Sequence, residues 1–117
     1  MSKIRLIAID PGIVITGFSI LEFYKSQINL LAYGAIKPPK KEKIEKRLMH
    51  LYDEASIIIR KFEPTVMTIE DSFYSKNVKS AFILGQARSS IMLAGAKSDL
   101  DIYHFAPRKI KQSVCGT

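Results

Sequence analysis

The sequence is poor in the residues that define several classes of protein. Only one of its 117 residues is cysteine, Cys115, so no disulfide can form within the chain. With two histidines, the sequence also lacks the Cys/His spacing of a zinc site. Tryptophan is absent, and no apolar run approaches the ~20 residues of a membrane span. The apolar stretch at residues 6–9 is too short for a signal-peptide core. We therefore expect a cytoplasmic protein with no membrane partner.

Acidic residues are scarce relative to basic ones. The chain has 11 Asp and Glu against 18 Lys and Arg, and this gives a formal net charge of +7. A charge of this sign favours an acidic partner, and nucleic acid before a membrane surface. Apolar residues make up 47% of the chain, which excludes a disordered or low-complexity protein. This length predicts one domain, residues 1–117, around one hydrophobic core.

The hydrophobic pattern predicts an α/β domain with the element order βββαβαβ. The expected strands are residues 4–9, 13–22, 28–36, 66–69 and 101–105, and the expected helices are residues 42–62 and a segment from Asn77 or Ser80 to about Ala96. An Asp-Pro-Gly turn ends the first strand, and Pro64 ends the first helix, whose apolar residues recur at spacings of three and four. Three strands followed by alternating helices and strands predict a mixed sheet.

Two carboxylates fall at the ends of apolar strands. Asp10 follows the first strand, and Glu70 lies at the end of the fourth. If these strands are neighbours, both side chains project from one sheet edge, where carboxylate oxygens suit Mg²⁺. Two such ions about 4 Å apart can activate water and stabilise the leaving oxygen in phosphodiester hydrolysis. The structural alternative is that Asp10 only begins a turn and Glu70 is an exposed strand end. His50 and His104 have no partner at ligand spacing.

A polar loop after the fourth strand holds two aromatic residues, Phe73 and Tyr74, followed by Lys76 and Asn77. Aromatic side chains in such a loop suit stacking on DNA bases. They suit equally a hydrophobic staple at the start of the second helix. The basic residues between 37 and 47 are open to two interpretations as well, a nucleic-acid surface or a solvated face.

Four groups of short segments occur together in a specific order and spacing. They are IAIDPG at 7–12 with TGF at 16–18, RL at 47–48 with EP at 63–64 and TIE at 68–70, FYSKN at 73–77 with SA at 80–81 and LGQAR at 84–88, and Y at 103 with APR at 106–108 and IKQ at 110–112. In these segments the chain resembles the RuvC family of bacterial Holliday junction resolvases, which have the ribonuclease H-like fold. The resemblance covers essentially the whole chain.

The resemblance implies a five-stranded mixed sheet flanked by helices and an endonuclease of DNA recombination and repair. It implies two Mg²⁺ or Mn²⁺ ions in a complete site, metal-binding and catalytic roles for Asp10 and Glu70, and a catalytic role for Lys111. DNA-binding roles are implied for Phe73, Lys76, Asn77, Arg88, Arg108, Lys109 and Lys111. The implied partners are four-way junction DNA, a second copy in a homodimer, and the branch-migration motor proteins RuvA and RuvB.

The chain departs from the family at its end. The family continues with two further helices, the last of which carries two more acidic ligands. We therefore expect a nuclease domain that is incomplete at its C-terminus, with little or no cleavage by these residues alone. Two alternatives stay open: a non-catalytic fragment that binds branched DNA, and an actin-like nucleotide-binding domain with a similar first hairpin. Residues 73–88 argue against the actin-like alternative.

Overall fold

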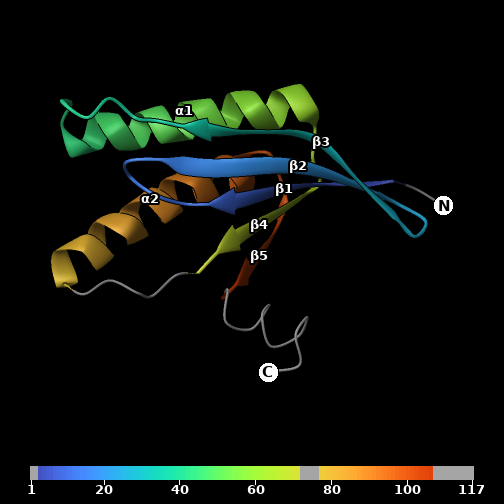
Figure 1. Ribbon diagram of the computed structural model, residues 1–117. Helices are drawn as coiled ribbons and strands as arrows, with labels where there is room; N and C mark the ends of the chain where they lie inside the picture. Colours follow the sequence, from blue (N-terminus) through green and yellow to red (C-terminus); the bar gives the residue numbers. More distant parts are fainter. Residues whose placement is uncertain (1–2, 72–76, 107–117) are drawn as a thin grey trace.

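The elements follow one another in the predicted order βββαβαβ (Figure 1). The structure, a computed structural model, describes residues 3–71 and 77–106. The elements are β1 (Ile4–Asp10), β2 (Thr16–Tyr24), β3 (Gln27–Ile36), α1 (Ile44–Phe62), β4 (Val66–Glu70), α2 (Val78–Lys97) and β5 (Asp101–Phe105). Neither helix in this described part of the chain is long and apolar enough to cross a membrane.

The strands form one mixed five-stranded sheet in the order β3-β2-β1-β4-β5, which confirms the predicted fold class. β1, β2 and β3 are antiparallel neighbours, whereas β4 runs parallel to β1 and β5 runs parallel to β4. α1 and α2 are the crossovers that parallel strands need. Because β1 and β4 are parallel neighbours, their carboxyl ends meet at one edge of the sheet, and Ile9 lies opposite Ile69 there.

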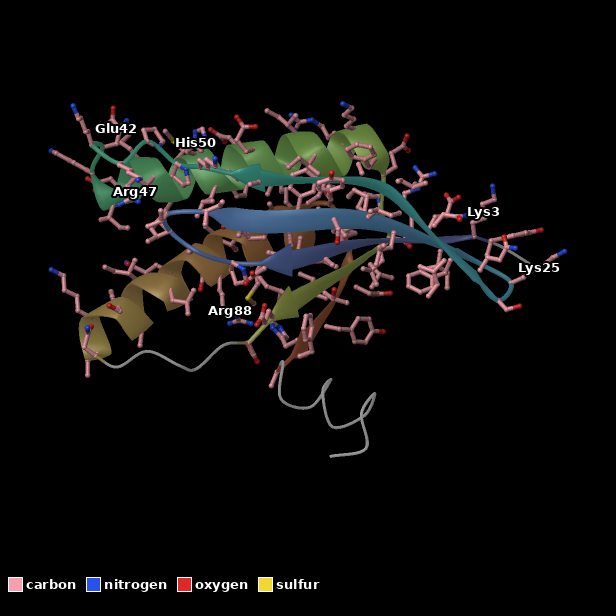
Figure 2. The ribbon with its side chains drawn as sticks, viewed as in Figure 1. Lys3, Lys25, Glu42, Arg47, His50 and Arg88 are labelled. Atoms are coloured by element: carbon pink, nitrogen blue, oxygen red, sulfur yellow. The ribbon has the colours of Figure 1, made fainter. Side chains whose placement is uncertain are left out.

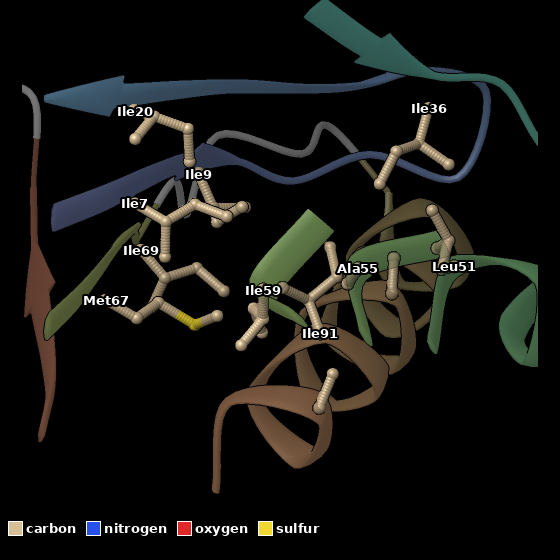
Figure 3. Close-up of a cluster of buried hydrophobic side chains, with 12 residues drawn as sticks. Ile7, Ile9, Ile20, Ile36, Leu51, Ala55, Ile59, Met67, Ile69 and Ile91 are labelled. Carbon is tan, nitrogen blue, oxygen red and sulfur yellow. The ribbon is translucent and has the colours of Figure 1, made fainter. Parts of the chain in front are cut away.

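Both helices pack on the same face of the sheet and share one hydrophobic core (Figure 3). The buried core residues are Ile7, Ile9, Ile20, Ile36, Met67 and Ile69 from the strands, Leu51, Ala55 and Ile59 from α1, and Ala87, Ile91 and Ala94 from α2. Since successive strand side chains point to opposite faces, the odd-numbered residues of β1 and β4 face the helices. The even-numbered residues, which include Asp10 and Glu70, lie on the opposite face.

The helix α1 ends as its sequence predicts. Glu63 follows the last helical residue in a left-handed conformation, with a φ of 51°, and its N–H donates to the Ile59 carbonyl at 2.8 Å. This is a common helix C-cap, and Pro64 then prevents continuation. The chain therefore turns directly into β4, and Glu70 is the last residue of that strand.

The sequence predicts that the second strand begins at Ile13, and this prediction is wrong: a short loop precedes β2, which begins at Thr16. The Thr16 hydroxyl, which is fully buried, accepts from the Gly12 N–H at 3.1 Å and donates to the Gly12 carbonyl at 2.8 Å. In addition, Arg47 of α1 donates to the Ile13 carbonyl at 2.9 Å. These contacts hold the β-branched residues between Gly12 and Thr16 out of the sheet, so β2 begins at Thr16.

Candidate metal and nucleic-acid site

The carboxyl ends of β1 and β4 bring Asp10 and Glu70 together. Each is the residue that follows the paired Ile9 and Ile69, and both lie on the face away from the helices. Burial raises the pKa of Glu70 above its ordinary value, and a hydrogen bond with Asp10 and the charge of Asp10 raise it further. The two carboxyl groups are therefore neighbours, and a cation between them would relieve their repulsion.

This pair of carboxylates has the chemistry of a hard-cation site. Both groups supply oxygen ligands, and Mg²⁺ is often held by only one or two carboxylates, with water and substrate phosphate as the other ligands. Within residues 3–71 and 77–106, no group of three or more Asp, Glu, His or Cys side chains is close enough to hold an ion. The donor set described by the structure therefore fits one weakly held Mg²⁺ or Mn²⁺.

A shallow hollow of about 260 Å³ lies beside Asp10. It is lined by Ala8, Ile9, Asp10, Gly17, Phe18, Ser19 and Gly34. Three of these, Ala8, Gly17 and Ser19, are the small residues of β1 and β2 on the face away from the helices. Their size leaves room for a substrate group next to the Asp10 carboxylate.

Arg88 of α2 reaches the carboxyl end of β4 (Figure 2). Its Nε donates to the Glu70 carbonyl at 3.3 Å, and its Nη2 contacts Asp71 Oδ1 at 2.5 Å and His104 Nδ1 at 2.5 Å. The Asp71 carboxylate is thus held by Arg88 on the helix side of the sheet. It points away from the pair formed by Asp10 and Glu70, because consecutive residues alternate between faces.

Asn77 has a structural role at the start of α2. Its side-chain oxygen accepts from the Ser80 N–H at 2.8 Å, which is the usual N-cap geometry. This settles the predicted start of the second helix in favour of Asn77. The remaining predicted DNA-binding and catalytic residues lie outside the described residues: Phe73, Lys76, Arg108, Lys109 and Lys111.

The contacts of Arg88, Asp71 and His104 were missed by sequence reasoning. The resemblance to the family implies a DNA-binding role for Arg88, and the sequence indicates no role for His104. The register of β4 and β5, which places His104 opposite Ile69, is what brings His104 to this place. Strand alternation predicts that Asp71 and Glu70 point to opposite faces, but no signal in the sequence places Arg88 and His104 beside Asp71.

The mixed sheet, with an acidic pair on its adjoining central strands, defines an α/β domain of the ribonuclease H-like class. The sequence matches the family described as crossover junction endodeoxyribonuclease RuvC over residues 6–117. The chain therefore belongs to the RuvC family.

Individual relatives agree with this assignment. The chain is 39% identical over 111 residues to crossover junction endodeoxyribonuclease RuvC of Ruminiclostridium cellulolyticum, covering 95% of this chain and 67% of the relative. It is 41% identical over 113 residues to the protein of the same name from Caldicellulosiruptor saccharolyticus, covering 96% and 68%. Among solved structures, T. thermophilus RuvC in complex with Holliday junction substrate has a TM-score of 0.89 at 21% identity, covering 97% of this chain and 70% of that one. This last likeness shows a shared fold.

Proposed function

We propose that this chain is the core of a structure-specific endonuclease that resolves Holliday junctions in DNA recombination and repair. The observation that carries the proposal is the pairing of Asp10 and Glu70 at the ends of adjacent parallel strands. The names of the relatives support it, as does a fold neighbour solved with Holliday junction substrate. The net charge of +7 suits a phosphate-rich partner.

In this proposal Asp10 and Glu70 hold Mg²⁺ or Mn²⁺, two ions in a complete site. When bound, such ions supply Lewis-acid polarisation and an activated water for phosphodiester hydrolysis. The two side chains present their oxygens from strands fixed by the sheet, so little reorganisation is needed on binding. The hollow beside Asp10 receives part of the DNA backbone, and Lys111 supports catalysis close to the scissile phosphate.

The proposed DNA contacts come mainly from the segments that follow β4 and β5. They are Phe73, Lys76, Asn77, Arg108, Lys109 and Lys111. An aromatic residue such as Phe73 can stack on an unpaired base, which contributes roughly 1–3 kcal/mol whatever the base. The basic residues bind phosphates and fix the position of the strand.

A homodimer would place two such sites on one junction for paired nicks. A groove between α1 and α2 supports self-association, because Met49, Phe82 and Leu93 around it are exposed apolar side chains. Contiguous exposed apolar surface of this kind marks interaction sites. RuvA and RuvB are the proposed motor partners. The proposed location of the protein is the cytoplasm.

Junction binding without cleavage is the second candidate function for these residues. The observation that favours it is the charge of the described site: two carboxylates carry −2, whereas two divalent ions carry +4. Magnesium dehydrates reluctantly and binds weakly unless several oxygens are arranged around it. We therefore expect this chain by itself to bind at most one ion and to cleave slowly or not at all.

Single-turnover cleavage of a synthetic four-way junction in Mg²⁺ tests the proposal. The chain is compared with a chimaera that carries, at its C-terminus, the part of the Ruminiclostridium relative that this chain does not cover. We expect metal-dependent nicking by the chimaera, lost in Asp10→Asn and Glu70→Gln without loss of junction binding. Nicking that survives both substitutions would overturn the proposed site. Full activity of the chain alone would exclude the binding-only alternative.

A further inference from the structure

One guanidinium joins three elements at the edge of the sheet that carries the acidic pair. Arg88 comes from α2, and its contacts reach the Glu70 carbonyl, the Asp71 carboxylate just after β4, and the His104 imidazole on β5. Only 20% of the Arg88 side chain is exposed, and 25% of that of Asp71. The guanidinium is therefore largely shielded from solvent, and its contacts lie at the neighbouring ends of β4 and β5.

The pairing of β1 with β4 stops one residue before Glu70, so the position of Glu70 is set by contacts other than those with β1. The register of these strands runs from Leu6 opposite Val66 to Ile9 opposite Ile69. Beyond that point, β4 is held by β5 on one side, where the Asp71 N–H donates to the Phe105 carbonyl at 2.6 Å. From the helix side it is held by Arg88.

The type of residue fits such a role. An arginine presents several donors in a rigid plane, so it can bind a carbonyl, a carboxylate and an imidazole nitrogen in fixed directions at once. Because a guanidinium has no acceptor, its contact with His104 Nδ1 requires that nitrogen to accept. A lysine would keep the positive charge at Arg88 but would lose this geometry.

We propose that Arg88 is a positioning residue that fixes the carboxyl end of β4, and so holds the Glu70 carboxylate beside Asp10 for cation binding. The inference rests on the proposed function, since it concerns the same pair of carboxylates. It gives Arg88 a role inside the protein and not at the DNA, with Asp71 and His104 as the groups that orient it.

The affinity for Mn²⁺ alone, measured by electron paramagnetic resonance of the free ion, tests this role. The variants are Arg88→Lys and Arg88→Gln, with Arg60→Lys and Arg60→Gln on an exposed part of α1 as matched controls. Loss of a group that orients a metal ligand lowers metal affinity by roughly tenfold or more. We expect that loss for both Arg88 variants, and an unchanged Mn²⁺ affinity for both controls.

Junction binding without metal separates positioning from DNA contact. If Arg88 only positions Glu70, Arg88→Lys lowers Mn²⁺ affinity and leaves junction affinity unchanged. A residue that binds phosphate through its charge would behave in the opposite way: Arg88→Gln would weaken junction binding while Mn²⁺ affinity stays the same. That second pattern, or unchanged Mn²⁺ affinity in both Arg88 variants, would overturn the inference.

A further variant guards against loss of folding. If melting curves show that the Arg88 variants do not fold, Asp71→Asn weakens the hold on the guanidinium while keeping its size, and a lower Mn²⁺ affinity is again expected. Junction binding by the unsubstituted chain tests the proposed function separately. If the chain does not bind junctions but its Mn²⁺ affinity still depends on Arg88, the proposed function fails and this inference stands. If the unsubstituted chain does not bind Mn²⁺, the inference fails.

Discussion

At the scale of single residues, the acidic pair opposes folding when no cation is bound. Burial, together with the hydrogen bond and charge of Asp10, raises the pKa of Glu70. A carboxyl with a raised pKa binds its proton more readily in the folded protein than in the unfolded chain. Stability therefore falls as the pH rises from the ordinary pKa of Glu70 through its higher pKa in the folded protein. Such local destabilisation is typical of functional sites.

Glu70→Gln should therefore stabilise the metal-free protein near neutral pH. The substitution removes one charge of the pair, so we expect the free energy of unfolding to rise by up to about 1 kcal/mol. At about pH 4, where the Glu70 carboxyl in the folded protein is already largely protonated, the gain should disappear. Urea denaturation at the two pH values measures the difference. A gain of equal size at both pH values would contradict a charge-based explanation.

Divalent cations should stabilise the protein through the same two side chains. A ligand at ten times its dissociation constant stabilises the folded state by about 1.4 kcal/mol. We expect Mn²⁺ to raise the melting temperature of the unsubstituted chain but not that of Asp10→Asn. Asp53→Asn, an exposed position on α1, is the matched control and should keep the full shift. An equal shift in Asp10→Asn would place the bound ion elsewhere.

At the scale of elements, local signals predicted most of the structure. The apolar spacing and Pro64 defined α1, and the continuous apolar run at residues 6–9 indicated the strand β1, although in the described residues only its helix-facing side is buried. The start of β2 was not predictable, because the β-branched residues before Thr16 favour a strand. Their place in a loop depends on the bonds between Thr16 and Gly12, and on Arg47 from a distant helix.

Two glycines of α2 should respond differently to alanine. A Cβ at Gly85 would have nothing within 4 Å, so Gly85→Ala should add stability of about 0.8–1 kcal/mol through helix propensity. At Gly95 a Cβ would lie 3.0 Å from Met67 Cε and 3.2 Å from Ile102 Cδ1. Crowding should cancel the gain there. Chemical denaturation of both variants measures the contrast, and equal gains would contradict the packing described for Gly95.

At the scale of the whole molecule, the pairing of Asp10 and Glu70 was predictable, because both residues end apolar strands. The sequence alone left open whether those strands were neighbours, and the parallel register of β1 and β4 confirms that they are. The contacts of Arg88 were beyond sequence reasoning. They join residues 16 and 18 positions apart and depend on how α2 lies against the ends of β4 and β5.

Binding of DNA should be strongly dependent on salt. The clustered Lys and Arg residues and the net charge of +7 point to contacts with several phosphates. If ~5 phosphates are neutralised, the logarithm of the binding constant should fall with the logarithm of salt concentration with a slope of about −4 to −5. Fluorescence anisotropy of a labelled junction across a KCl series gives this slope. A slope near zero would contradict a nucleic-acid partner.

If this chain is the core of a junction-resolving nuclease, as proposed, it recognises the branched shape of DNA and does not merely bind its charge. The most direct test is competition, at fixed salt, between a labelled four-way junction and unlabelled linear duplexes of the same arm sequences. Charge alone supplies non-specific binding to both kinds of DNA. We therefore expect an unlabelled junction to displace the labelled junction at a much lower phosphate concentration than the unlabelled duplexes do. Displacement by junction and duplex at the same phosphate concentration would contradict it.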